Sequence, residues 1–257
     1  MLLRRVIAHV RRQEWTAIAL DFLIVVFGVF FGIQVSNWNE SRREIARGHG
    51  YLVRINSDIS ADLESLERRS VFWRKVIDHG HNAIRYAETG ELVDRSAWKT
   101  LLAFYQASQL FPWMSTDTTF QELRSAGDLA LIADPSLRTE LSNYYMTGTG
   151  SQANYLLSAM PEYRKIVRGL TPSVASAQVW ANCHKAPAFD EQYLYDCESP
   201  MPDAQAQAVL NAYLDDPRLL SELRYWITNL EVSMTLIDLN HEAARALAAR
   251  LPSESGP

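Results

Sequence analysis

Hydrophobic positions follow two patterns along the chain, and the first is an unbroken apolar stretch at 16–36. The first twenty residues of this stretch are apolar around all sides of a helix, and Asp21 is one of only three clearly polar residues among them. A helix of that length measures roughly 30 Å, the thickness of the hydrocarbon core of a bilayer. Trp15 and Trp38 flank it, as aromatic residues do at the two membrane interfaces. The pattern predicts a transmembrane helix over 16–36.

Two other kinds of segment share this apolar pattern: a buried core helix and a cleaved signal peptide. A core helix is seldom apolar on every face over such a length. The apolar run exceeds the usual core of a signal peptide, and the following residues QVSNWNE lack the small-residue cleavage pattern. We therefore expect an uncleaved membrane anchor.

Basic residues on the two sides of the anchor predict its orientation. Four arginines precede it and three follow it closely, and the more basic side normally stays in the cytoplasm. The bias predicts a short cytoplasmic segment over 1–15 and an outer domain over 37–250. In a bacterium this places the anchor in the inner membrane and the outer domain in the periplasm, with the lipid bilayer as a partner.

The second pattern begins after the anchor, where apolar residues recur at steps of three and four or their sums. This spacing forms one face of a helix; the positions are Leu52, Ile55, Ile59, Leu63, Leu66, Trp73, Ile77 and Ile84. The pattern predicts a long helix or helical hairpin that can continue the anchor. Glycines at 48 and 50 weaken it locally, because Gly costs about 1 kcal/mol against Ala in a helix. A break is expected at 88–91.

Capping signals divide the rest of the outer domain into further helices. We expect Asp94 to cap the helix that follows it, and Asp117 and Gly127 to begin and end a short one. The segments DPSLRTEL (134–141) and DPRLLSEL (216–223) each offer an Asp cap followed by Pro at the first helical position. No segment has a convincing strand pattern. The prediction is an all-α outer domain, a bundle of about six or seven helices.

The two cysteines, Cys183 and Cys197, lie in a Pro-rich stretch at 171–203 that we expect to be a loop. In an oxidising compartment they can form a disulfide, worth about 3 kcal/mol for a loop of this size. The alternative is two unrelated thiols. The segment 251–257 is expected to be a disordered tail.

The anchor ends in GIQVSNWNE, and residues 119–145 read TFQELRSAGDLALIADPSLRTELSNYY. These two stretches resemble a bacterial family of single-pass membrane proteins of unknown function. The resemblance covers about a fifth of the chain and does not reach the cysteines. It implies membrane anchoring and a helical outer domain, and it implies no reaction.

Composition and motifs narrow the range of functions. The net charge of −5 makes the chain a poor match to a phosphate backbone, so we expect no nucleic-acid partner. The chain has no nucleotide-binding glycine loop and no nucleophile elbow, and we expect no cofactor. His184 between the cysteines offers a third metal ligand, but a disulfide would occupy both sulfurs. We predict no metal site and no catalytic residue.

One surface is predicted within the anchor itself. Gly28 and Gly32 are spaced so that two helix backbones can approach closely. At about 100° per residue, Asp21 lies within about 20° of the line through them, and Ala17 flanks the same line. An acid in lipid is costly, so Asp21 either pairs on this face or reaches toward water. The face predicts self-association or binding of another membrane protein.

Three functions remain open on the sequence alone. The first is a non-enzymatic, membrane-anchored interaction or scaffold protein of the periplasm. The second is a ligand-sensing domain that acts through a partner, with a pocket rimmed by Trp113, Tyr144 and Tyr145. The third is an anchored enzyme with an unrecognised site, in which Glu122, Ser125 and Asp128 converge with Asp117.

Overall fold

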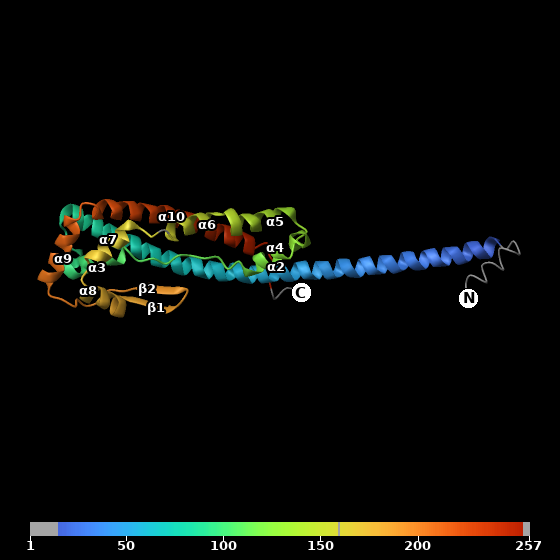
Figure 1. The fold of residues 1–257 in the computed structure, drawn as a ribbon, viewed down its shortest axis with the longest axis horizontal. Coiled ribbons are helices and arrows are strands. Elements are labelled where there is room, and N and C mark those ends of the chain that lie inside the picture. Colours follow the sequence, from blue (N-terminus) through green and yellow to red (C-terminus); the bar gives the residue numbers. More distant parts are fainter. Residues whose placement is uncertain (1–14, 159, 254–257) are drawn as a thin grey trace.

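A computed structural model describes residues 15–158 and 160–253, so most of the predicted segment 1–15 lies outside the described residues. Its main feature is helix α2 (Trp15–Thr89), which is 75 residues long and runs from the apolar stretch through the whole body (Figure 1). The predicted continuity of the two patterns is confirmed. The glycines at 48 and 50 do not interrupt the helix, and the expected break follows at Gly90, whose φ is +75°.

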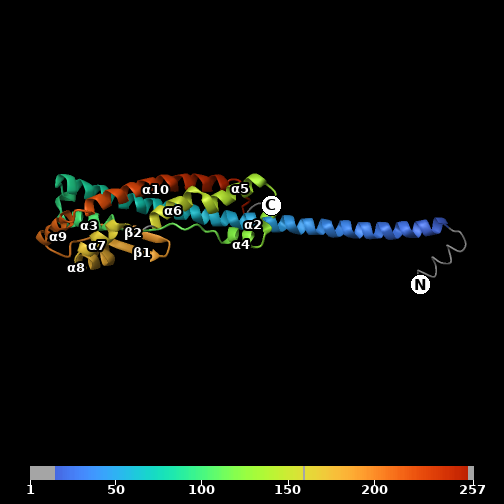
Figure 2. The ribbon, with the colours of Figure 1, turned by 45° about the horizontal axis from the view of Figure 1, so that its top comes forward.

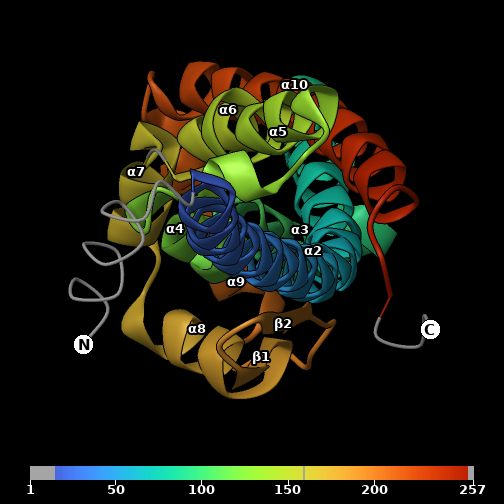
Figure 3. The ribbon, with the colours of Figure 1, turned by 90° about the vertical axis from the view of Figure 1, so that its right-hand side faces the viewer.

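The other helices of the body pack around the second half of α2. The longest is α10 (Leu219–Ala248), which lies along α2 and also packs against α6 (Thr149–Ser158). Viewed along the long axis, α10 and α6 lie on one side of α2 and a small β-hairpin on another (Figure 3). The remaining α-helices are α3 (Ala97–Gln106), α4 (Thr118–Ser125), α5 (Pro135–Ser142), α7 (Glu162–Leu170), α8 (Ser173–Gln178) and α9 (Asp203–Asp215).

Short helical turns connect several of these elements. They are η1 (Val93–Arg95), η2 (Asp128–Leu131), η3 (Asn143–Thr147) and η4 (Val179–Cys183). The chain is overwhelmingly helical, as predicted. Over the described residues the body contains α3 to α10 and part of α2, which is more helices than the six or seven expected; one of them, α8, lies inside the predicted loop at 171–203.

A β-hairpin in the same segment is a second departure from the all-α prediction. Strands β1 (His184–Ala188) and β2 (Glu191–Leu194) pair antiparallel, with His184 opposite Leu194. Four of the five residues of β1 are exposed, so the strand has no buried face and no alternating pattern to reveal it. Pro187 within the strand further weakens the signal.

Two buried clusters divide the core along the length of α2. The cluster far from the anchor is built on large aromatic side chains, including Trp73, Phe104 and Trp226. Two of its indoles also have acceptors, since Trp73 Nε1 donates to Phe111 O at 3.2 Å and Trp226 Nε1 donates to Ala107 O at 2.9 Å. The cluster near the anchor contains the apolar face of α2 from Tyr51 to Ile59, with members of α4, α5 and α10.

The predicted caps are partly corrected. Ser96, and not Asp94, caps α3 through a bond from Lys99 N; Asp94 instead has a φ of +50° and pairs with the Lys99 ammonium. Asp117 precedes α4, but its carboxylate bonds to Gln121 Nε2 and caps no backbone N–H. In both places the carboxylate bonds instead to a side chain within the next five residues, Lys99 or Gln121.

Other residues that were predicted to mark helix ends do so in the structure. Gly127 has a φ of +74°, and Asp134 accepts the Ser136 N–H at the start of α5. Asp216 makes the equivalent bond with Arg218 N, although α10 begins only at Leu219. The expected tail starts later than residue 251, because Leu251 is buried and Pro252 O accepts a bond from Asn56 Nδ2.

Candidate functional site

The apolar part of α2 stands free of the body (Figures 1 and 2). Among the described helices, α2 is the only one long and apolar enough to cross a membrane. Asp21, Gly28 and Gly32 are exposed, and a Cβ added at either glycine would meet nothing within 4 Å. Ala17 lies on the same helix. Other described residues of the stretch are exposed as well, so the packing face on this side of the helix stays a prediction.

An exposed neck joins this stretch to the body. Residues 37–47 are all exposed and continue α2 by roughly 16 Å. Trp38 lies at its start, where the Arg42 guanidinium sits 5.1 Å from the centre of the indole ring; Trp15 is exposed at the other end of the apolar stretch. The neck ends at Gly48, where the backbone of Leu131 approaches so closely that a Cβ would lie 2.6 Å from its carbonyl oxygen.

Beyond the neck, arginines of α2 hold the element around Glu122. Arg54 binds both carboxylate oxygens of Glu122, at 2.7 and 3.1 Å. Arg47 donates to Asp128 at 3.1 Å, and the Tyr51 hydroxyl donates to the same carboxylate at 3.2 Å. The ion pair lowers the pKa of Glu122 below its ordinary value. These acids clamp α4 and η2 onto α2.

The predicted convergence of acids around Glu122 does not occur. Glu122 is exposed and paired with an arginine, Asp117 bonds to Gln121, and Ser125 is exposed. Each acid is thus explained by a neighbour within the fold. This arrangement does not provide the unpaired, buried carboxylate that acid–base chemistry would need.

A different acid, Asp62, accepts two hydrogen bonds inside the core. Its side chain is fully buried, and it accepts the Thr116 N–H at 2.6 Å and the Tyr144 hydroxyl at 2.8 Å. Burial raises its pKa above the ordinary value, although both hydrogen bonds oppose that shift. Sequence reasoning missed Asp62, but a signal was available, since it falls on the apolar face between Ile59 and Leu66.

The expected rim of a ligand pocket is part of the core. Trp113, Tyr144 and Tyr145 are all buried, with 3%, 4% and 8% of their surfaces exposed. Tyr145 stacks on Phe120 and meets the edge of Tyr144. These rings pack inside the two buried clusters, and the Tyr144 hydroxyl bonds to Asp62.

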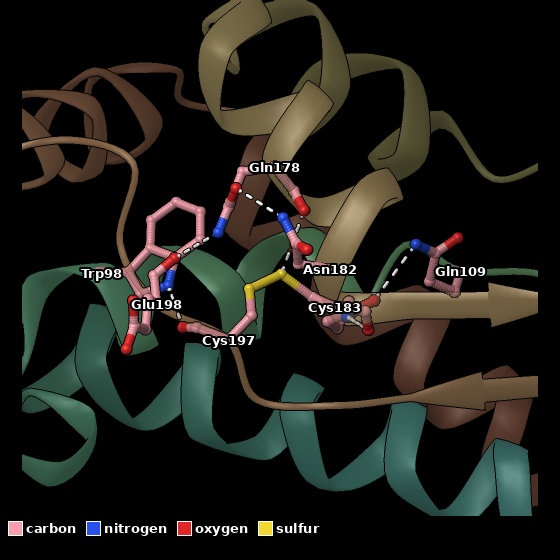
Figure 4. The surroundings of a disulfide bond; sticks show 8 residues. Trp98, Gln109, Gln178, Asn182, Cys183, Cys197 and Glu198 are labelled. Carbon is pink, nitrogen blue, oxygen red and sulfur yellow. Dashed lines mark hydrogen bonds between the residues drawn. A yellow bond between two sulfur atoms is a disulfide. The ribbon is translucent and has the colours of Figure 1, made fainter.

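The two cysteines hold the ends of the β-hairpin together (Figure 4). Cys183 immediately precedes β1, Cys197 follows β2, and the disulfide joins them with their Cα atoms 5.2 Å apart. Their backbone carbonyls are held as well, since Trp98 Nε1 donates to Cys197 O and Gln106 Nε2 donates to Cys183 O. The bond occupies both sulfurs that a metal site with His184 would need.

The hairpin covers an apolar pocket on α2. The pocket has a volume of about 200 Å³ and is lined by Val71, Phe72, Tyr193 and Leu194 together with five charged or polar residues. Arg68 fixes the hairpin turn through the carboxylate and carbonyl of Asp190. At that turn Phe189 is 81% exposed, so the disulfide-bonded hairpin presents apolar and aromatic surface to the outside.

We compared the chain with protein-family models, with curated proteins and with solved structures, and found no match in any of the three. The family resemblance of the anchor and of segment 119–145 therefore stays a prediction. The function has to be argued from the geometry of the chain itself.

Proposed function

We propose that this chain is a membrane-anchored, non-enzymatic interaction protein of the bacterial inner membrane, with its N-terminus in the cytoplasm and its body in the periplasm. The observation that carries the proposal is the continuity of α2. One helix provides both the exposed apolar stretch and the central support of the folded body. An interaction module held at a fixed height above a bilayer needs this connection.

The body supports the proposal through the surface that it presents. The hairpin exposes Phe189, Tyr193 and Tyr195 beside the apolar pocket on α2. Exposed aromatic residues around an apolar recess are typical of protein-binding surfaces. The disulfide that holds this hairpin is favoured in an oxidising compartment, in agreement with a periplasmic body.

The anchor supplies a second contact surface. Gly28 and Gly32 leave the backbone of α2 open to close approach, and Asp21 lies on the same side of the helix. A second copy, or the span of another membrane protein, can pack there and provide a polar partner for the acid.

A bacterial membrane association assay tests the anchor. Gly28→Ile together with Gly32→Ile adds side chains on the packing face and is expected to reduce association at least several-fold. Val26→Ile with Phe30→Ile is the matched control, because these residues lie about 120–160° away from the two glycines on the helix. Unchanged association of the glycine variant would show that this face is not used.

The placement of the body is tested separately with reporter fusions at the C-terminus. We expect alkaline phosphatase, which is active only outside the cytoplasm, to be active, and a cytoplasm-dependent fluorescent protein to be dark. The reverse pattern would refute the proposed orientation without bearing on the anchor face.

A further inference from the structure

Two arginines on α7 are half-buried with no carboxylate beside them. Arg164 and Arg168 are one turn apart, so their side chains share one face of the helix. Neither forms an ion pair within the described part of the chain. Burial lowers the pKa of Arg164 to about 10, and the charge of Arg168 adds to this shift. Burial likewise lowers the pKa of Arg168.

Neutral groups hold both guanidinium groups in place. Arg164 Nη1 donates to the carbonyl of Ser108, while Arg168 donates through Nε to Ser108 Oγ at 3.0 Å and through Nη2 to Gln109 Oε1 at 2.8 Å. These acceptors lie just after α3, where the helix dipole provides about half a negative charge. That amount does not balance two full positive charges.

Aromatic rings fix the orientation of Arg168. Its guanidinium carbon lies 4.9 Å from the ring centre of Tyr105 and 5.4 Å from that of Trp180. Trp180 is 46% exposed, so the cluster reaches the protein surface. The remaining N–H groups of both arginines have no acceptor within the described residues.

A third basic group, His184, completes the cluster. Its ring meets Trp180 at 4.6 Å between centres, and its Nε2 lies 3.2 Å from Gln192 Oε1. His184 and Arg168 both contact the Trp180 ring, which brings the imidazole close to the guanidinium group. Burial lowers the pKa of His184, and the charges of Arg168 and Arg164 lower it further.

We propose that Arg164, Arg168 and His184 form a binding site for an oxyanion, a phosphate or carboxylate group carried by a soluble ligand. The planar guanidinium fork matches the paired oxygens of both groups. The cluster lies at the end of the body away from the anchor, among α7, α8 and β1 (Figures 1 and 2). That position favours a soluble anion over a lipid headgroup. The inference is independent of the anchor and of the hairpin surface.

The test uses the full-length protein in nonionic detergent, titrated with sodium phosphate, sodium acetate or sodium chloride at equal ionic strength. We expect phosphate or acetate to raise the midpoint of thermal unfolding by about 3–6 °C at ten times the dissociation constant, relative to chloride. The response to phosphate compared with acetate identifies the preferred group. Equal midpoints in all three salts would overturn the proposal.

Substitutions on α7 locate the effect. Arg164→Gln is expected to abolish the shift, and Arg164→Lys, which keeps the charge and loses the fork, to weaken binding several-fold. Lys165→Gln is the matched control, because it removes the same charge from the neighbouring exposed residue and should leave the shift unchanged. A full shift in Arg164→Gln would refute the site.

A measurement on the unmodified protein covers the case in which a variant does not fold. Phosphate or acetate should move the Nε–H NMR signals of Arg164 and Arg168 in a saturable way. Arg224, which is paired with Glu88, should not respond. Saturable changes confined to other arginines would contradict the assignment.

Discussion

The Oδ2 atom of Asp62 accepts a 2.8 Å hydrogen bond from the hydroxyl of Tyr144, 82 positions further along the chain. The same carboxylate accepts the Thr116 N–H through Oδ1. One buried acid therefore ties α2 to the segment that enters α4 and to η3, the turn after α5. Four predictions test this contact and the structure around it.

Asp62→Asn is expected to change how stability depends on pH. The pKa of Asp62 is raised in the folded protein above its ordinary 3.8, so folding favours the protonated acid. The cost of the buried charge is present above the folded pKa and disappears as the pH falls through it toward 3.8. The amide has no such cost. In urea unfolding, the free energy of unfolding of the variant should therefore exceed that of the wild type at pH 7. The difference should be smaller at pH 4.

Tyr144→Phe removes a donor from the same carboxylate without changing the size of the ring. Leaving a buried acceptor short of a partner costs about 1–3 kcal/mol. We expect that loss in unfolding free energy at pH 7. Tyr225→Phe, at a position 68% exposed, is the control and should be neutral. Equal effects of the two would show that the hydroxyl of Tyr144 contributes nothing specific.

Gly48 and Gly50 form a matched pair for testing the contact between α2 and η2. Alanine normally stabilises a helix by about 1 kcal/mol over glycine, and Gly50→Ala should show this gain because its Cβ meets nothing within 4 Å. Gly48→Ala should instead lose at least about 1 kcal/mol, since its Cβ would lie 2.6 Å from Leu131 O. Chemical unfolding of both variants gives the two free energies of unfolding. If both substitutions were stabilising, the contact between Gly48 and Leu131 would leave room for a Cβ atom.

Removing the disulfide should loosen the hairpin first. Cys183→Ser with Cys197→Ser is expected to cost about 3 kcal/mol of unfolding free energy. Amide exchange should accelerate in β1 and β2 well before it does in α2. A reducing agent should reproduce the change in the wild type and have no effect on the double variant. Unchanged amide exchange in the hairpin would show that packing on α2 holds the hairpin in place without the disulfide.

Local patterns in the sequence were enough to predict the long helix, its end near Gly90 and the turns at Gly127 and Asp134. Those features depend on neighbouring residues. The hairpin was missed because β1 is exposed on both faces and owes its place to a covalent bond and to Arg68, which is 122 positions from Asp190. The cap at Asp94 failed because Ser96 competed with it.

The candidate sites show the same division. The glycine spacing of the anchor is a property of consecutive turns and can be read directly. The cluster of Arg164, Arg168 and His184 is assembled by α3, α7 and β1, with Arg168 59 positions from Gln109. No pattern in the sequence predicts that these elements bring the three side chains together.

Because α2 does not break, it fixes the rotation of the body relative to the exposed apolar stretch. Ala46 follows Gly28 by about five full turns, so both point the same way, while Gly48 and its contact with η2 point roughly opposite. A copy that packs against Gly28 is thereby directed toward Ala46, and η2 faces away from it. The number of residues in the neck thus determines how the body is rotated about the axis of α2. Inserting two residues there would turn the body by about 200° relative to the apolar stretch.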